Sequence, residues 1–234
     1  MMTIKRRISI VLAVCIFVTG VVLVVFPIVS KWIGDYEDSS MVDDFDDFIS
    51  DSGNMYNIDL DRLYRDIKKY NEDLFIRGRD YLPDMYTFDK PHFDLRSYGA
   101  PDDTFGYIEA PAISLRLPIY LGASVENMKR GAGNLYQTSV PIGDKNTNAV
   151  LAAHTGMENK TMFDNIVKLN NNDDVYVTNF WSRLHYKVVK TQIVLPNASS
   201  VVDIEPDKDI VTLLTCYPYR KNTHRFVVVC ERVD

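Results

Sequence analysis

The sequence from Thr104 onward is a succession of short β-rich segments, and this pattern restricts the fold more than any other feature. β-Branched and aromatic residues dominate each segment, and Gly, Pro, Asn or Asp separates it from the next. The segments are GYIEAP, ISLRLPIYLG, NAVLAAHTG, DVYVTN, RLHYKVVKTQIVLP, DIVTLLTC and HRFVVVCERV. Short helices are expected only at 125–130 and 161–169. The pattern is typical of a closed or nearly closed all-β barrel.

An apolar segment near the N-terminus predicts a membrane anchor. Residues 8–30 carry no charge, and as a helix they would be about 34 Å long, against about 30 Å of hydrocarbon in a bilayer. A cleaved signal peptide is the alternative, but its apolar region is usually shorter and no small-x-small cleavage pattern follows. Lys5, Arg6 and Arg7 precede the segment, so the positive-inside rule places the N-terminus in the cytoplasm. We therefore expect a single-pass protein of the cell membrane with its β-rich region outside.

The region between the anchor and the barrel is predicted to contain a linker, a helix and a loop. Residues 35–51 hold eight carboxylates and neither Lys nor Arg, which suggests an acidic linker. An amphipathic helix with Asn57 as its N-cap is expected next, because apolar residues recur at spacings of three and four: Leu60, Leu63, Ile67, Tyr70 and Leu74. The proline- and aromatic-rich residues 76–103 are expected to form a loop, with a lid as a further hypothesis. The predicted divisions of the chain are thus 1–30, 31–103 and 104–234.

The charge distribution argues against a nucleic-acid-binding protein. The chain has a formal net charge of −6, and the acidic residues 35–51 contribute −8 of it, which leaves +2 on the remainder. Neither a basic surface nor a generally acidic domain follows from this balance. No nucleic-acid partner is expected.

Two cysteines, Cys216 and Cys230, lie outside the predicted anchor, whereas Cys15 lies within it. A disulfide between the two would be permitted in an oxidising compartment. Side chains alternate along the strand RFVVVCERV, however, so Arg225 and Cys230 point to opposite faces. If Cys216 shares a face with Arg225, Cys230 cannot reach it, although a bulge would reverse this relation. We therefore expect Cys216 to carry a free thiol.

Cys216, Arg225 and His154 are the candidate catalytic residues. Cys216 ends the segment DIVTLLTC, and a tight reversal through YPYRKNT would bring Arg225 alongside it. A guanidinium is a permanently charged donor suited to a carbonyl oxygen that becomes negative. His154 ends the apolar segment AVLAAH and supplies a group that can position and transfer a proton. The other histidines lie in a loop, in mid-strand or facing away from Arg225: His92, His185 and His224.

Other cysteine chemistries fit the sequence less well. Cys216, His224 and Cys230 have seven and five residues between them, which matches none of the usual zinc spacings. Neither a metal nor a cofactor is therefore predicted. In a papain-like protease the cysteine precedes the histidine, whereas here His154 precedes Cys216.

Several motifs resemble those of the sortase family. VTLLTC and THRFVV contain Cys216 and Arg225, and AAHTG contains His154. The segments GYIEAPAISLRLPIYLGAS and GAGNLYQTSVPIG are similar to the class C, pilus-assembling branch. The similarity extends from about residue 105 to 233 and keeps the order His, Cys, Arg. The resemblance implies an eight-stranded sortase barrel in which His154, Cys216 and Arg225 are the catalytic residues.

The resemblance also implies a reaction and its partners. Sortases are cysteine transpeptidases that cleave an LPxTG-like sorting signal between Thr and Gly, form a thioacyl-enzyme and transfer the acyl group to an amine. In class C this amine is a pilin lysine, which is the function expected here. A surface protein joined to a peptidoglycan precursor is the alternative, and an inert peptide-binding barrel is a third hypothesis. Two features depart from class C: no second apolar segment follows the barrel region, and DKPHF and LPDMY do not reproduce the Asp-Pro-aromatic lid motif.

Overall fold

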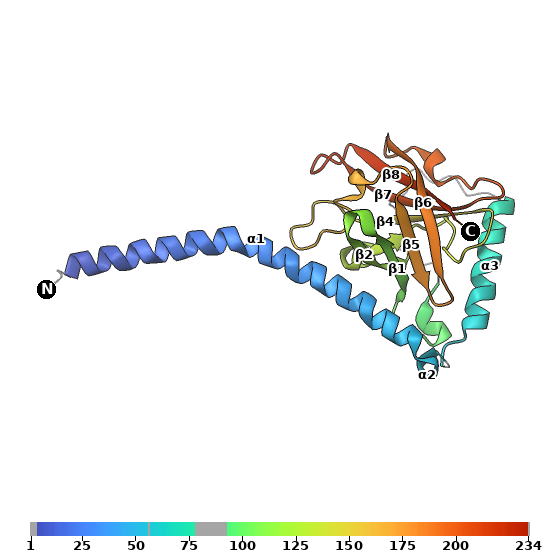
Figure 1. Cartoon of the computed structure of the whole chain (residues 1–234), viewed down its shortest axis with the longest axis horizontal. Coiled ribbons are helices and arrows are strands. Elements are labelled where there is room, and N and C mark those ends of the chain that lie inside the picture. The colour runs from blue at the N-terminus through green and yellow to red at the C-terminus, as the bar shows by residue number, and fades with distance from the viewer. Residues whose placement is uncertain (1–3, 56, 78–92, 234) are drawn as a thin grey trace.

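A computed structural model describes residues 4–55, 57–77 and 93–233 and shows a β-barrel beside a long N-terminal helix (Figure 1). The strands form one closed sheet in the order β1-β2-β3-β4-β7-β8-β6-β5. The eight-stranded barrel implied by the resemblance is therefore confirmed. The strands are β1 (Thr104–Ala110), β2 (Leu115–Leu121), β3 (Ala132–Asn134), β4 (Thr147–Ala152), β5 (Asp174–Asn179), β6 (Arg183–Val194), β7 (Asp209–Tyr217) and β8 (His224–Arg232).

Helices are few within the barrel, as the sequence predicts. The helix expected at 125–130 is α4 (Val125–Arg130), whose N-terminus is capped by the Ser124 side chain. The helix expected at 161–169 is wrong, because only the 3-10 turn η3 (Ile166–Lys168) forms there. Three further 3-10 turns are η1 (Leu95–Tyr98), η2 (Pro111–Ile113) and η4 (Ser199–Val202). The strand β3 was not predicted, since its sequence Ala-Gly-Asn carries no β-branched or aromatic residue.

The predicted acidic linker is instead the second half of one continuous helix, α1 (Ile4–Ser50). Its apolar first half is, within the described part of the chain, the one helix long and apolar enough to cross a membrane. In the second half, Val42 and Phe45 are buried against the barrel, and Phe48 and Ile49 pack beside them. These residues recur at spacings of three and four, so an apolar stripe runs through the acidic segment and holds it on the barrel as a helix.

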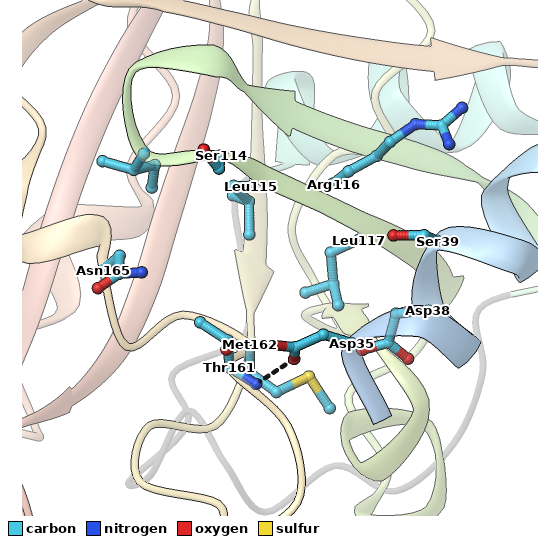
Figure 2. A pocket seen from close by; sticks show the side chains of 11 residues that line it. Asp35, Asp38, Ser39, Ser114, Leu115, Arg116, Leu117, Thr161, Met162 and Asn165 are labelled. Carbon is cyan, nitrogen blue, oxygen red and sulfur yellow. Dashed lines mark hydrogen bonds between the residues drawn. The ribbon is translucent and has the colours of Figure 1, made fainter. Parts of the chain in front are cut away.

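The carboxylates of α1 find partners on the barrel. Asp35 accepts hydrogen bonds from the Thr161 backbone N at 2.7 Å and from its hydroxyl at 2.6 Å (Figure 2). Asp38 forms an almost fully buried ion pair with Lys160. Burial raises the pKa of Asp38 to about 6, although the Lys160 ammonium opposes this shift. The turns of α1 that follow the apolar half are thus bonded to the segment between β4 and β5.

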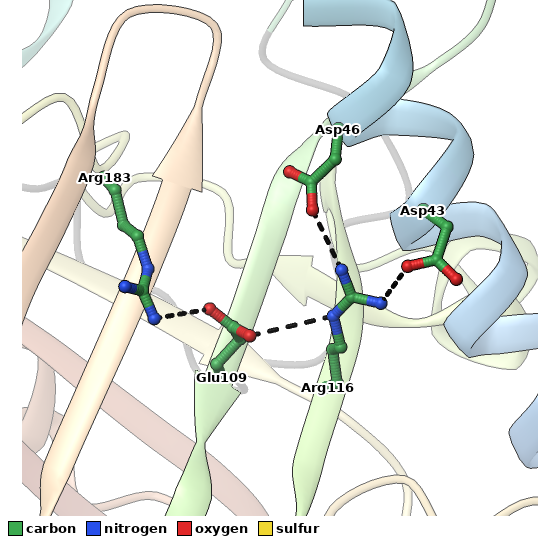
Figure 3. A network of polar contacts seen from close by, with 5 residues as sticks. All are labelled: Asp43, Asp46, Glu109, Arg116 and Arg183. Carbon is green, nitrogen blue, oxygen red and sulfur yellow. Dashed lines mark hydrogen bonds and ion pairs between the residues drawn. The ribbon is translucent and has the colours of Figure 1, made fainter. Parts of the chain in front are cut away.

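Further along α1, a second set of ion pairs joins it to β1 and β2. Arg116 on β2 pairs with Asp43 and lies 2.9 Å from Asp46 (Figure 3). Glu109 on β1 lies 3.7 Å from Arg116 and 3.0 Å from Arg183 on β6, which extends the network across three strands. Such networks of partly exposed charges orient a helix more than they stabilise it, since each exposed pair contributes about 1 kcal/mol or less.

Two helices follow α1 in the chain, the single turn α2 (Ser52–Met55) and the longer α3 (Leu60–Arg77). α3 is the predicted amphipathic helix, with Leu63 and Ile67 buried. Its N-terminus is capped by Asp59, which accepts from the Arg62 backbone N at 3.1 Å, so the expected Asn57 cap is wrong. The hypothesis of a lid falls largely on residues 78–92, which lie outside the described residues, as does His92.

Candidate active site

Cys216 and Arg225 face each other across the hairpin formed by β7 and β8. The two strands are antiparallel, and Cys216 is the direct cross-strand partner of Arg225. The Arg225 guanidinium is held by the turn, because its Nη1 donates to the carbonyls of Asn222 and His224, each at 3.1 Å. Directly opposite side chains on a sheet lie about 5 Å apart at Cβ. The pairing predicted from the nine-residue spacing is therefore present.

His154 reaches the same end of the barrel from β4. β4 is parallel to β7, with Ala152 opposite Leu214. The pairing continues beyond the strand, since the Ala153 backbone N donates to the Leu214 carbonyl at 3.3 Å and the Thr215 hydroxyl donates to the Ala153 carbonyl at 2.7 Å. One residue further along this register, His154 comes beside Cys216. The structure thus places the three predicted site residues at one end of the barrel, where β4 and β7 end and β8 begins.

The site lies on the outer face of the barrel, next to a small apolar cluster. Leu214 and Val227 form the next same-face cross-strand pair after Cys216 and Arg225, and both belong to this cluster. η4 and α4 cover it from outside, through Val201, Val202 and Met128. Cys216 itself is half-buried at the edge of the cluster.

Cys230 occupies the opposite side of the sheet from Cys216. It pairs with Val211, is fully buried and belongs to the main core inside the barrel. Burial raises the pKa of its thiol well above the ordinary range, which makes it a poor nucleophile. All three cysteines are described and all are free. The side-chain alternation used to separate Cys230 from Cys216 is therefore confirmed.

The remaining described histidines have other partners. His185 on β6 stacks on Tyr176 with ring centroids 4.6 Å apart, and its Nε2 lies 2.7 Å from Asp174. The Nδ1 of His224 lies 2.9 Å from the Thr223 hydroxyl. Neither ring is part of the arrangement around Cys216, so among the described histidines His154 is the candidate partner of the thiol.

The environment of His154 favours a neutral imidazole. Partial burial lowers the pKa of His154, and the positive charge of Lys129 on α4 lowers it further. A neutral imidazole can accept the proton of a thiol, which a protonated one cannot. Sequence reasoning missed Lys129, because only the docking of α4 on β3, the neighbour of β4 in the sheet, brings this exposed residue towards His154.

Removing the Lys129 charge is expected to raise the pKa of His154. In Lys129→Gln, one of the two causes that disfavour the imidazolium is absent, while burial remains. The pKa should therefore rise but stay below the ordinary histidine value. A titration of the His154 ring signals by NMR, assigned with His154→Gln, measures the change.

Lys208→Gln is the matched control. Lys208 pairs with Glu205 and Glu231 just before β7 begins, at the opposite end of that strand from Cys216. An unchanged titration in Lys129→Gln would contradict this account.

The loop that follows His154 is also ordered by a residue that sequence reasoning missed. Asp164 Oδ1 accepts from the Gly156 backbone N at 2.6 Å and from the Thr155 hydroxyl at 3.1 Å. The His154 carbonyl accepts from the Phe163 backbone N at 3.1 Å. Residues 155–164 thus fold back on themselves, and the backbone at His154 is tied into that loop.

Comparison with known proteins agrees with this geometry. A family model described as the sortase domain matches residues 108–233. Sortase D of Bacillus subtilis (strain 168) is 28% identical over 131 residues, which are 55% of this chain and 63% of that protein. The chain thus matches less than two thirds of that relative's length.

Solved structures extend the similarity beyond the barrel. Clostridium perfringens sortase C, in a crystal structure with the C-terminal cell wall sorting motif, is 39% identical with a TM-score of 0.69, covering 84% of this chain and 99% of that chain. Sortase C1 of group B Streptococcus pilus island 1 is 28% identical with a TM-score of 0.72, covering 84% of this chain and 92% of that chain. The chain therefore belongs to the sortase family of cysteine transpeptidases, in its class C branch.

Proposed function

We propose that this protein cleaves an LPxTG-like sorting signal between Thr and Gly and transfers the acyl group to a pilin lysine. The observation that carries the proposal is the cross-strand pairing of Cys216 with Arg225 in a sortase barrel, with His154 just beyond the end of β4, the strand that runs parallel to β7. The similarity to class C structures, one of them containing a cell wall sorting motif, supports the substrate class. The pilin acceptor is the part of the proposal that rests on class C membership alone.

The first half-reaction forms a thioester on Cys216. The Cys216 sulfur attacks the Thr carbonyl carbon while neutral His154 accepts the thiol proton. The oxygen of the tetrahedral intermediate becomes negative, and the Arg225 guanidinium donates hydrogen bonds to it. The carbon–nitrogen bond to Gly then breaks as His154 returns the proton to the leaving amine. The thioester and a peptide with a free N-terminal Gly are the products.

The second half-reaction releases the acyl group to an amine. A neutral lysine ε-amine attacks the thioester carbonyl, and Arg225 again donates to the oxygen that becomes negative. His154 accepts a proton from the attacking amine and returns it to the Cys216 sulfur as the carbon–sulfur bond breaks. An isopeptide bond results, and the thiol is restored. Transfer exceeds hydrolysis only when the amine reaches the thioester before water does.

The protein is proposed to act at the outer surface of the cell membrane. Residues 8–30 of α1 would span the bilayer, with Lys5, Arg6 and Arg7 on the cytoplasmic side. The helix is long and apolar enough for this role, and its side chains there are exposed rather than packed on the barrel. The barrel and its substrates would then lie outside the cytoplasm.

Attachment of surface proteins to a peptidoglycan precursor is the second candidate, because the match to sortase D shows that the similarity is not confined to sortases C. The two reactions share the first half-reaction and differ in the amine that accepts the acyl group.

A competition experiment separates the two functions. The full chain in nanodiscs receives one LPxTG-like donor peptide and equal amounts of a lysine-containing pilin peptide and a peptidoglycan stem peptide. The proposal expects a mass-spectrometric product joined through the lysine side chain. Product formed only on the stem peptide would replace pilin assembly with wall anchoring.

A further inference from the structure

The helix α1 passes without interruption from the proposed membrane span to the barrel (Figure 1). Ser30 is the last residue of the proposed span, and the next residue, Lys31, already contacts the barrel. Its ammonium lies 2.8 Å from Asp164 Oδ2. Because a helix rises about 1.5 Å per residue, this contact lies within a few ångströms of the end of the span. The barrel thus begins at the level where the hydrocarbon ends.

The part of the barrel bonded to these turns of α1 is the loop that follows His154. Lys31 contacts Asp164, which in turn holds Gly156. One and two turns later, Asp35 holds Thr161 (Figure 2) and Asp38 pairs with Lys160. These contacts are distributed over the whole loop, so its height relative to the span is set by α1. His154 immediately precedes the loop.

A recess of about 850 Å³ lies between the end of the span and two loops of the barrel. Pro27 and Ile28 line it from the span, Met157 from the loop after His154, and Tyr219 and Arg220 from the turn between β7 and β8. Residues 26–28 are about 3–6 Å below the end of the span along the helix. The polar layer of a bilayer is about 5–7 Å thick on each side. The α1 residues that line the recess extend from these positions to Asp35, about 8 Å above the end of the span, so both loops face the boundary between hydrocarbon and headgroups.

The exposed side chains in this region suit a bilayer surface. Trp32, Tyr36 and Tyr219 are 68%, 66% and 54% exposed, and Trp32 stacks on Tyr36 with ring centroids 6.1 Å apart. The Arg220 guanidinium lies 5.3 Å from the centre of the Tyr219 ring. Trp and Tyr favour the membrane interface, where the ring is partly in hydrocarbon, and Arg favours lipid phosphate. Without a bilayer, more than half of the surface of each of these three residues would remain exposed to water.

We propose that the end of the barrel that carries His154, Cys216 and Arg225 docks on the membrane, with residues 155–160 and 217–223 among the phospholipid headgroups. The partner of this surface is the bilayer itself. The inference rests on the proposed membrane anchor and deepens the proposed function, because it restricts the cleaved peptide bond to the immediate vicinity of the membrane. A peptide held far from the bilayer would then be a poor substrate, even with the correct sequence.

Depth-dependent quenching of tryptophan fluorescence by brominated lipids tests this docking directly. The full chain is placed in phosphatidylcholine nanodiscs with either ordinary or brominated acyl chains. In a background lacking Trp32 and Trp181 through phenylalanine substitutions, Tyr219→Trp places a single tryptophan in one loop and Met157→Trp in the other. Docking predicts that brominated lipid removes about half or more of the fluorescence at each position, as expected for interfacial residues.

Two native tryptophans supply matched controls. A protein retaining only Trp32 reports the interface beside the span and should be quenched. A protein retaining only Trp181 should not be, since Trp181 packs on Tyr64 of α3, on the side of the barrel away from the span (Figure 1). Quenching of Trp32 with none at Tyr219→Trp and Met157→Trp would overturn the docking, as would equal quenching of Trp181.

This test is independent of catalysis. It needs no substrate and can be repeated in Cys216→Ala protein. Quenched loops in a protein that forms no thioester would retain the docking and remove the proposed function. Unquenched loops in a protein that forms the thioester would retain the proposed function and overturn the docking. Using one position in each loop prevents a folding defect in a single variant from deciding the outcome, and quenching at only one position would overturn the docking of the other loop.

Discussion

Replacing Cys216 with alanine is expected to reduce peptide transfer by about a thousand-fold or more while leaving the barrel folded. In the proposed mechanism the Cys216 sulfur forms the covalent intermediate, and the other described cysteine of the barrel cannot substitute for it. Cys230 lies inside the barrel, fully buried, with a raised thiol pKa. The expected change in unfolding free energy is about 1 kcal/mol or less, because Cys216 is half-buried at a strand end.

Cys15→Ala is the matched control for the loss of a thiol. Cys15 is exposed on the apolar half of α1, far along the chain from the site. Its substitution should leave transfer unchanged. Activity would be measured as ligated product from a donor and an acceptor peptide, and folding by thermal denaturation. A Cys216→Ala protein with substantial transfer would show that the nucleophile has been assigned to the wrong residue.

Replacing Arg225 with lysine is the second large effect, a loss of about 10²–10³-fold in the rate of transfer. One edge of the Arg225 guanidinium is used by the turn, since Nη1 donates to the carbonyls of Asn222 and His224. The planar group can satisfy these carbonyls and still direct another N–H towards the substrate oxygen. A lysine ammonium keeps the charge but has one nitrogen for both tasks. Both kcat and kcat/KM should fall, because the interaction with the oxygen strengthens only as its negative charge develops.

Arg183→Lys controls for a general effect of replacing arginine on a strand. Arg183 begins β6, pairs with Glu109 at 3.0 Å and stacks over Tyr176, on strands that carry none of the three site residues. Its substitution should leave transfer near the wild-type rate. Near-normal transfer in Arg225→Lys would mean that charge alone is sufficient and that Arg225 does not act through its fork of donors. An increase in KM with unchanged kcat would assign Arg225 to substrate binding instead.

The strands of the barrel could be predicted where their own residues have a high β-propensity. β7 and β8 are dominated by β-branched and aliphatic residues. The expected tight reversal between them placed Arg225 beside Cys216, and side-chain alternation then placed Cys230 on the other face. β3 could not be found in this way, because it pairs through the backbone of Ala132, Gly133 and Asn134 between two longer strands. Tertiary pairing, rather than local propensity, makes that segment a strand.

The acidic half of α1 shows a different limit. Counting carboxylates at 35–51 predicted a linker, yet Val42, Phe45 and Ile49 already stood at helical spacing within the same residues. Their spacing favoured an amphipathic helix, but the high density of carboxylates in the same residues led to the prediction of a linker. The partners of the carboxylates could not be predicted from the sequence, because Arg116 and Lys160 are 70 and 122 residues away from Asp46 and Asp38 and contact α1 only in the folded protein.

The surroundings of the site were the least predictable part. His154 was selected from its place at the end of an apolar segment, but its position beside Cys216 depends on the parallel register of β4 and β7, whose paired residues are 62 apart in sequence. Lys129 and Asp164 reach this region through α4 and the loop before β5. No local pattern identifies them, because exposed Lys and Asp residues are common throughout the chain.

Intact-mass spectrometry of the full chain with a peptide containing an LPxTG-like signal tests the central claim most directly. The account predicts an adduct with the mass of the peptide cleaved after Thr, present in wild-type protein and absent in Cys216→Ala. Hydroxylamine should remove the adduct, because it cleaves thioesters. An adduct that persists in Cys216→Ala, or no adduct across several signal variants in protein shown to be folded, would contradict the thioacyl chemistry proposed here.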